Sequence, residues 1–307
     1  MSTTYGFIEL VANISEGQNK QQVAIIGKAG ENAGAILLDI HHDHDHNRSV
    51  LTFAGYPQDV AATARALLSS CQKHLDISAH QGVHPRFGAF DVCPFIPLEW
   101  TDSAQGSNTA CTIAQQTAQA AAALDIPAFF YERASKNHHS LPYVRKHAFT
   151  EIRPDRGPLH PHPTTGAVAI GVRSLLVAYN IDISTGCLDT ARSIAARVRE
   201  TAGGPVGIRS LALRLPQQKR TQISMNLLRP GRTGIAAAWQ AVQNEAARED
   251  VTLIAGELVG LLPRCALRDC SDEILTLSQL HENKTLEHAL HRVGLRENSS
   301  DLDCCAG

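Results

Sequence analysis

The chain has 307 residues, 43% of them hydrophobic and 19% charged, which is enough for two globular units with their own cores and excludes a disordered protein. Its formal net charge of −2 excludes the general attraction to nucleic acid or anionic membranes that basic proteins show. No apolar run reaches the roughly 20 residues that cross a bilayer, and residues 1–5 lack the features of a signal peptide, so we expect a cytoplasmic protein.

Hydrophobic spacing predicts a β-α-β-β-α-β order in the first half of the chain. Strands are predicted at residues 6–15, 35–40, 49–53 and 89–96, with a helix from residue 16 to about residue 30. A second helix begins at Pro57, since apolar residues recur from Val60 to Cys71 at three- and four-residue spacing. A helix at about 108–124 and a strand at 128–131 extend this unit.

The second half repeats this order. Strands are predicted at residues 174–183, 208–213, 222–228 and 251–255, and helices at 188–201 and 233–248. The chain is therefore predicted to be α+β, with two tandem split β-α-β sandwich subdomains, each an antiparallel-rich sheet with helices on one face. Their predicted bounds are residues 1–173 and 174–307, with a mobile tail from about residue 298.

Residues 153–166 lie between the two halves and contain four prolines and two glycines, which exclude regular structure. One interpretation is a stiff linker of polyproline geometry. The other is part of a ligand pocket, because pockets favour interfaces between similar sheets. Both interpretations stay open at this point.

The most informative segment runs from His80 to Pro97. Gly82, Pro85 and Gly88 prevent a regular helix, and an alternating apolar strand follows. His84 therefore lies on a shaped loop beside Arg86, at the start of a strand, where proton-transfer groups are commonly mounted. The alternative is a surface loop with solvated histidines.

Two further segments carry polar groups. Ser15 or Asn13 is predicted to cap the first helix, whose N-terminus could also receive an anion. Residues 41–48 alternate histidine with aspartate, which permits either a metal site or a turn that contributes Asn47 and Arg48 to a pocket. Of these we favour the turn and expect no metal. Residues 166–171 lack the lysine and the third glycine of nucleotide-binding loops.

The eight cysteines are scattered. None forms a C-x-x-C pair, Cys265 and Cys270 are five residues apart, and Cys304 and Cys305 are adjacent near the end. These spacings do not fit a zinc site, and a disulfide framework is not expected in a chain of this length, so we expect free thiols.

Together these motifs resemble the formiminotransferase domain of the glutamate formimidoyltransferase family, which uses folate to break down histidine. The specific run is H-x-G-x-H-P-R-x-G-x-x-D-V-C-P-F, at His80 to Phe95. The stretches that match, in family order and over almost the whole chain, are residues 11–17, 37–39, 47–50, 80–97, 141–145, 157–158, 171–173, 178–180, 222–228 and 257–263. A cyclodeaminase half is absent, so the chain resembles the single-function form.

The resemblance implies a folate tunnel between the subdomains, a homodimer and a proton shuttle at His84, with tetrahydrofolate as co-substrate and small molecules as the partners. The family's folate-contact segment corresponds to Gly157 through Gly166. The substrate- and folate-binding candidates are Asn13, Asp39, Asn47, Arg48, His80, Arg86, Gly157, Pro158, His162, Thr164 and Gly166. Two departures from the animal proteins are His41, where they carry aspartate, and residues 160–163, where they carry a Ser/Trp stretch.

The implied reaction gives the residues their roles. N5 of tetrahydrofolate attacks the amidine carbon of N-formimino-L-glutamate and loses a proton, and the departing nitrogen gains one, which a histidine can mediate. Arg48 and Arg86 are the candidates to orient carboxylates. Asp39 or Asp91 could hold the His84 tautomer. The alternatives are formyl transfer between 5-formyltetrahydrofolate and glutamate, and a folate- or metal-binding protein without turnover.

Overall fold

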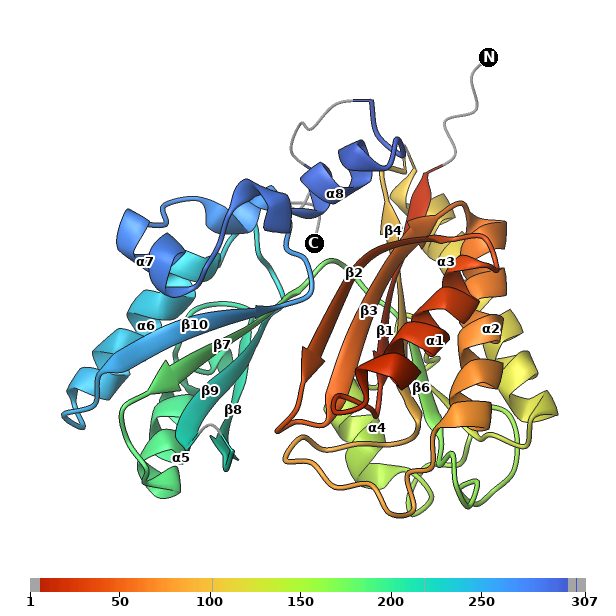
Figure 1. Cartoon of the computed structure of the whole chain (residues 1–307), viewed down its shortest axis with the longest axis horizontal. Helices are drawn as coiled ribbons and strands as arrows, with labels where there is room; N and C mark the ends of the chain where they lie inside the picture. The colour runs from red at the N-terminus through yellow and green to blue at the C-terminus, as the bar shows by residue number, and fades with distance from the viewer. Residues whose placement is uncertain (1–5, 101, 218, 298–301, 303–307) are drawn as a thin grey trace. The chain divides into compact units, whose positions relative to one another are not determined.

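The computed structural model describes residues 6–100, 102–217, 219–297 and 302, and the chain divides into two compact units, Met1–Arg173 and Ser174–Gly307 (Figure 1). Each unit has its own sheet and its own hydrophobic core. The protein is therefore α+β with two tandem subdomains. Of the predicted tail from about residue 298, only Leu302 is among the described residues.

Unit 1 is built on a mixed sheet of six strands in the order β2-β3-β1-β4-β6-β5. Neighbours are antiparallel from β2 to β4, whereas β6 runs parallel to both β4 and β5. The strands are β1 (Phe7–Ile14), β2 (Ile36–Asp43), β3 (Arg48–Gly55), β4 (Phe90–Leu98), β5 (Ala128–Glu132) and β6 (Val168–Val172).

Helices α1 (Lys20–Glu31), α2 (Pro57–His74) and α3 (Ser103–Ala123) cover one face of this sheet (Figure 1). Their apolar sides join the inward residues of the strands in the main core of the unit. The short helix α4 (Leu141–His147) packs through Val144 against Phe129 and Tyr131, in a smaller cluster on side chains that alternate with that core. The opposite face is therefore only partly covered by α4, which leaves room for polar side chains.

Three features of unit 1 differ from the prediction. The sequence did not predict α4 or β6, and β2 continues through His41 and His42, which were expected in a turn. The predicted cap of α1 is also wrong: the helix begins at Lys20, so Asn19 is its N-cap and accepts from the amides of Gln21 and Gln22.

The interpretation of residues 153–166 as a linker is wrong. Arg156 forms a bridge with Ala128 at the start of β5, and Gly166 bridges both His162 and Gly88. The segment therefore belongs to unit 1, and the chain enters unit 2 only after β6.

Unit 2 is built on a four-stranded antiparallel sheet in the order β10-β7-β9-β8. Its strands are β7 (Val177–Ile183), β8 (Ile208–Leu215), β9 (Arg220–Leu227) and β10 (Leu253–Val259). Helices α5 (Leu188–Arg197) and α6 (Ile235–Ala247) share a core with the inward side chains of these strands. The remaining elements are η1 (Glu200–Ala202), η2 (Arg264–Leu267), α7 (Asp272–Leu277), η3 (Glu282–Lys284) and α8 (Leu286–Arg292).

The cysteines partly contradict the expectation of free thiols. Cys71, Cys93, Cys111, Cys187 and Cys270 are free. Cys265, at η2, is disulfide-bonded, so the prediction fails there. Within the described part of the chain, no helix has the length and apolarity needed to cross a membrane.

Candidate active site

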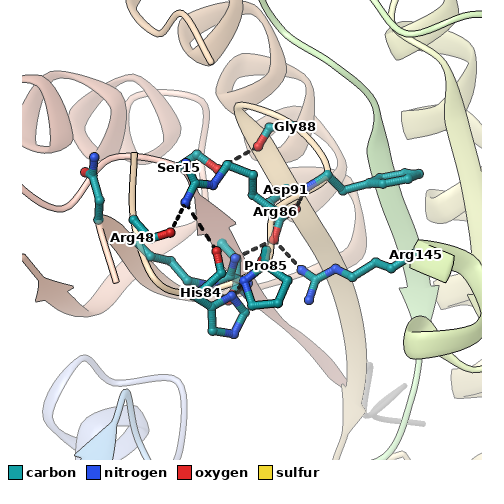
Figure 2. A network of polar contacts seen from close by, with 12 residues as sticks. Ser15, Arg48, His84, Pro85, Arg86, Gly88, Asp91 and Arg145 are labelled. Carbon is teal, nitrogen blue, oxygen red and sulfur yellow. Dashed lines mark hydrogen bonds and ion pairs between the residues drawn. The ribbon is translucent and has the colours of Figure 1, made fainter. Parts of the chain in front are cut away.

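The centre of the site is Asp91, a fully buried carboxylate on β4. Arg48, at the start of β3, and Arg145, on α4, both form ion pairs with its Oδ2 (Figure 2). Its Oδ1 accepts a hydrogen bond from the backbone amide of Phe87. Asp91 thus joins two arginines and the loop that carries His84.

A second contact fixes the guanidinium of Arg48. Its Nε and Nη2 both donate to Oδ1 of Asn13 on β1, at 3.2 and 2.7 Å. Asn13 in turn donates to the carbonyl of Val11 at 2.8 Å. The sequence-predicted pair Asn13 and Arg48 is therefore brought together, although Asn13 acts as an acceptor for Arg48 and does not cap a helix.

His84 lies beside this cluster and is half-buried. Its Nδ1 is 2.7 Å from the carbonyl oxygen of Pro85. Because a carbonyl only accepts, Nδ1 carries the ring proton, and in the neutral imidazole Nε2 carries the lone pair. The ring of His46 lies 5.7 Å away, centroid to centroid. His84 therefore presents Nε2 as its basic atom.

Electrostatics favour the neutral form of His84. Burial lowers the pKa of His84 well below the ordinary value of 6.5, and the positive charges of Arg48 and Arg145 lower it further, with Asp91 opposing them. Burial would raise the pKa of Asp91, but Arg48 and Arg145 outweigh it, so that pKa lies below its usual value. At neutral pH the site therefore holds an ionised Asp91 and a neutral His84.

Arg86 makes its contacts within its own loop. Its guanidinium donates to Nδ1 and the carbonyl of His80, and to the carbonyls of Gly82 (2.7 Å) and His84 (3.3 Å). Arg86 therefore holds the shape of the loop to which it belongs. His80 is held the same way, since its Nε2 is 3.0 Å from the carbonyl of Asn47.

Asn47 connects this loop to the start of α1. Its Oδ1 accepts from the amide of Gly17 at 2.9 Å, and its Nδ2 donates to the carbonyl of Gln81 at 2.8 Å. Its backbone φ of 46° is one that asparagine tolerates well. Gly17 is packed directly on the backbone of Asp43 and Arg48, where a Cβ has no room. Asn47 thus positions the loop through these hydrogen bonds.

The C-terminal end of the predicted folate segment contacts the residues just before β4. Nδ1 of His162 accepts from the amides of Thr164 and Thr165, at 3.3 and 3.1 Å, and holds a turn that ends at Gly166 beside Gly88. The carbonyl of Thr164 accepts from the amide of Ile77 at 2.8 Å. Gly157 and Pro158 lie further along, with Gly157 packed against Ile126 and Pro127.

The structure places the residues of two alternatives that the sequence left open. Of the two carboxylates considered for the His84 tautomer, Asp91 lies in the cluster and Asp39 lies on β2 opposite Thr52, while Nδ1 of His84 itself donates to the carbonyl of Pro85. Among the residues that the structure describes, no three His, Cys, Asp or Glu side chains converge as a metal-binding group, and the histidines of residues 41–46 are divided between β2 and the turn after it. Sequence reasoning did not identify Arg145 as a site residue, and only the resemblance of residues 141–145 pointed to it.

The site places one basic imidazole nitrogen beside two cations that outnumber their carboxylate, an arrangement that is typical of enzyme active sites. Comparison with known proteins makes this more specific. The formiminotransferase domain, N-terminal subdomain, matches residues 7–173, and the formiminotransferase domain matches residues 178–302. The chain therefore belongs to the formiminotransferase family.

Individual relatives carry names of the same family. The glutamate formimidoyltransferase of Streptococcus pyogenes serotype M1 is 31% identical over 91% of this chain and 96% of its own length. That of Thermoplasma acidophilum is 33% identical over 94% of this chain and 99% of its own. The formimidoyltransferase-cyclodeaminase of Sus scrofa is 31% identical over 94% of this chain, but that match covers 56% of the pig protein.

Proposed function

We propose that the protein transfers the formimino group of N-formimino-L-glutamate to tetrahydrofolate, giving 5-formiminotetrahydrofolate and L-glutamate. The observation that carries this proposal is the basic Nε2 of His84 beside the Asp91 cluster, in a chain of the formiminotransferase family. Support also comes from two relatives named glutamate formimidoyltransferase, which match over nearly their whole length.

In the proposed reaction His84 is the proton shuttle. N5 of tetrahydrofolate attacks the amidine carbon and gives up a proton to Nε2 of His84. The imidazolium then returns a proton to the glutamate nitrogen as the C–N bond breaks. A histidine that is neutral at pH 7 is ready to accept first, and such catalysis is worth roughly 10²–10⁴-fold.

The arginines give the site its preference for anions. Arg48 and Arg145 carry two positive charges against the single charge of Asp91, and all three side chains are largely buried. Nε of Arg145 is buried and has no hydrogen-bond partner among the described residues. We infer that a substrate carboxylate binds at Arg145, because a buried guanidinium donor needs an acceptor.

Folate is a co-substrate in this proposal, and residues 157–166 are its proposed contact segment in unit 1. Five features stay predictions from the sequence: the split β-α-β sandwiches, the folate tunnel, the homodimer, the cytoplasmic location and the place in histidine breakdown. Light scattering on the purified chain measures the predicted dimer directly.

Product formation, followed by mass spectrometry, tests the function. The protein is incubated with tetrahydrofolate and N-formimino-L-glutamate, and in parallel with 5-formyltetrahydrofolate and glutamate. We expect product in the first reaction. Product only in the second would replace formimino transfer with formyl transfer, and no product in either, with folate still bound, would indicate a binding protein without turnover.

The role of His84 has its own test. His84→Ala should lower kcat by about 10²-fold or more, as expected for the loss of a general acid–base catalyst, and leave the affinity for folate within a few-fold. Calorimetric titration with 5-formyltetrahydrofolate measures that affinity without turnover. A loss of folate binding equal to the loss of rate would exclude the shuttle role.

A further inference from the structure

His46 is a second imidazole at the site of unit 1, and the proposed reaction does not yet use it. It lies in the turn between β2 and β3, and the residue is 8% exposed. Its ring centroid is 5.7 Å from that of His84, with 32° between the ring planes. Both histidines belong to unit 1, so this contact lies within one compact unit.

Backbone hydrogen bonds hold this turn and the His84 loop together. The amide of His46 donates to Oδ1 of Asp43 at 2.6 Å. The amide of Val83 donates to the carbonyl of Asp45 at 3.1 Å. Neither of these bonds uses the imidazole of His46, so they give no reason for a histidine side chain at this position.

The ring of His46 carries an unsatisfied nitrogen. Its Nε2 is buried, and it has no hydrogen-bond partner in the part of the chain that the structure describes. Buried polar atoms in folded proteins are nearly always paired, because an atom that loses water and gains no partner destabilises the fold. A phenyl ring would fill the same space without that cost. The nitrogen therefore indicates a partner from outside the chain.

The neighbouring side chains restrict what this partner is. Arg48 and Arg145 carry only donors, and Asp91 already accepts from both of them. An unprotonated imidazole, in contrast, has one ring nitrogen that accepts. Among these side chains, the imidazoles of His46 and His84 are therefore the acceptors that remain for an N–H group of a substrate.

The formimino group presents such an N–H. In the proposed reaction, Nε2 of His84 exchanges protons with the two nitrogens between which the amidine carbon moves. The terminal nitrogen of the formimino group is bonded to that same carbon and carries hydrogen, whereas a formyl group has an oxygen there. Hydrogen bonds of about 3 Å from nitrogens on one carbon can reach two imidazoles whose centroids are 5.7 Å apart.

We propose that Nε2 of His46 accepts a hydrogen bond from the terminal N–H of the formimino group, and that His46 thereby selects formimino over formyl substrates. The inference rests on the proposed function, because it assigns one atom of that substrate to a named residue. The two imidazoles then have different tasks. His84 moves protons, and His46 holds the group that is transferred.

The test combines kcat/KM for formiminoglutamate, at saturating tetrahydrofolate, with calorimetric titration by 5-formyltetrahydrofolate. His46→Phe keeps a planar ring and removes the acceptor. It should lower kcat/KM about 10- to 100-fold, because the N–H loses its partner. It should leave the affinity for 5-formyltetrahydrofolate within about 3-fold, because the formyl oxygen has no hydrogen to donate.

Two amide variants keep the inference testable if His46→Phe does not fold. The amide of glutamine reaches the position of Nε2 and can accept there, so His46→Gln should retain most of the activity. The amide of asparagine lies closer to the backbone, near the position of Nδ1, so His46→Asn should lose activity as His46→Phe does. Equal activities of these two variants would overturn the assignment to Nε2.

His44→Phe is the matched control. His44 lies in the same turn, and its side chain is exposed. This variant makes the same change of side chain beside the site, so it should keep both the wild-type kcat/KM and the wild-type affinity for 5-formyltetrahydrofolate. An equal loss of activity in His44→Phe and His46→Phe would assign the effect to the turn and overturn the inference.

The outcomes separate this inference from the proposed function. If the wild type forms no product from formiminoglutamate, the proposed function fails and this inference fails with it. If the wild type is active and His46→Phe matches it, only this inference is overturned. The same holds if His46→Phe weakens 5-formyltetrahydrofolate as much as it lowers kcat/KM, because His46 would then contact both groups alike.

Discussion

Asp91 is the residue on which the geometry of unit 1's site depends. Its carboxylate holds Arg48 from β3, Arg145 from α4 and the amide of Phe87 from the His84 loop. Three segments that are distant in the chain thus converge on one buried charge. Removing that charge leaves two guanidinium groups without their partner in a buried site, which is the costly case for a buried ion pair.

We therefore expect Asp91→Asn to lower the free energy of unfolding by about 3–5 kcal/mol. Urea denaturation measures the change. Asp189→Asn is the control, since Asp189 pairs with Arg192 at 2.9 Å but both side chains are mostly exposed, so stability should hardly change. Equal effects of the two substitutions would show that the Asp91 cluster does not stabilise the fold.

The pH dependence of catalysis tests the electrostatic coupling of His84. The free enzyme needs a neutral His84, so kcat/KM should rise as pH increases through the pKa of His84. Burial and the charges of Arg48 and Arg145 lower that pKa, so the rise should lie below pH 6.5. Removing one positive charge stabilises the imidazolium, raises the pKa and moves the rise to higher pH.

Arg145→Met should show this shift, whereas Arg145→Lys, which keeps the charge, should not. Both variants should raise the KM for formiminoglutamate if Arg145 binds its carboxylate. The pH profile of kcat/KM, measured for the wild type and both variants, tests whether the charge of Arg145 lowers the pKa of His84. A profile of Arg145→Met that coincides with that of the wild type would contradict the coupling.

At this scale, the sequence drew attention to residues that lie in a recognisable motif. His84 and Arg48 were chosen as candidates because their segments have unusual composition and match a family, and the structure places both at the Asp91 cluster. Arg145 was missed because it meets Asp91 across 54 residues, and nothing near Arg145 in the sequence indicates that contact. The sequence also could not show that donors of Arg86 go to carbonyls of its own loop, because those contacts depend on how the loop folds back.

Among the elements, residues 88 and 89, which lead into β4, contact the turn at residues 162–166. This contact holds these loops of unit 1 together. Gly88 bridges Gly166, the amide of Ala89 donates to Thr165 at 2.8 Å, and Ser15 donates to the carbonyl of Gly88 at 2.8 Å. A Cβ on Gly88 would meet the carbonyl oxygen of Thr165 at 2.7 Å, and that of Ala167 more closely still. Only glycine lets these backbones approach so closely.

Gly88→Ala should therefore destabilise the chain by about 1–3 kcal/mol and weaken folate binding, since the turn has to move. Urea denaturation and titration with 5-formyltetrahydrofolate measure the two effects. Gly186→Ala is the control, because a Cβ there meets nothing within 4 Å. If Gly88→Ala bound folate with unchanged affinity, the turn would have no part in the folate site.

Long amphipathic elements were predicted well and short ones poorly. The strands from β1 to β4 and the helices α1 to α3 are each eight residues or longer, which gives a run of apolar residues room to show in the sequence. β6 is five residues long and buried throughout, so it lacks the alternation that marks a strand, and α4 has only seven residues. The linker interpretation failed because proline and glycine exclude helices and strands but do not exclude packing against a sheet.

At the scale of the whole molecule, each unit has a main hydrophobic core of its own among the described residues. Phe95 belongs to the core of unit 1 and Ile223 to that of unit 2, and both are 0% exposed. A core is the cooperative unit of unfolding, and chains with more than one core commonly depart from two-state behaviour. The repeat in the sequence pattern predicted this division, because each half has strands and helices enough to bury its own apolar residues.

We therefore expect calorimetry of the full chain to resolve two unfolding transitions. Phe95→Ala should lower the midpoint of one transition by about 10 °C, and Ile223→Ala that of the other, because each leaves a cavity in one core only. Ile25→Ala, at a side chain that is 50% exposed, should move neither. A single transition displaced by both core substitutions would contradict this, and would mean that the two units unfold as one.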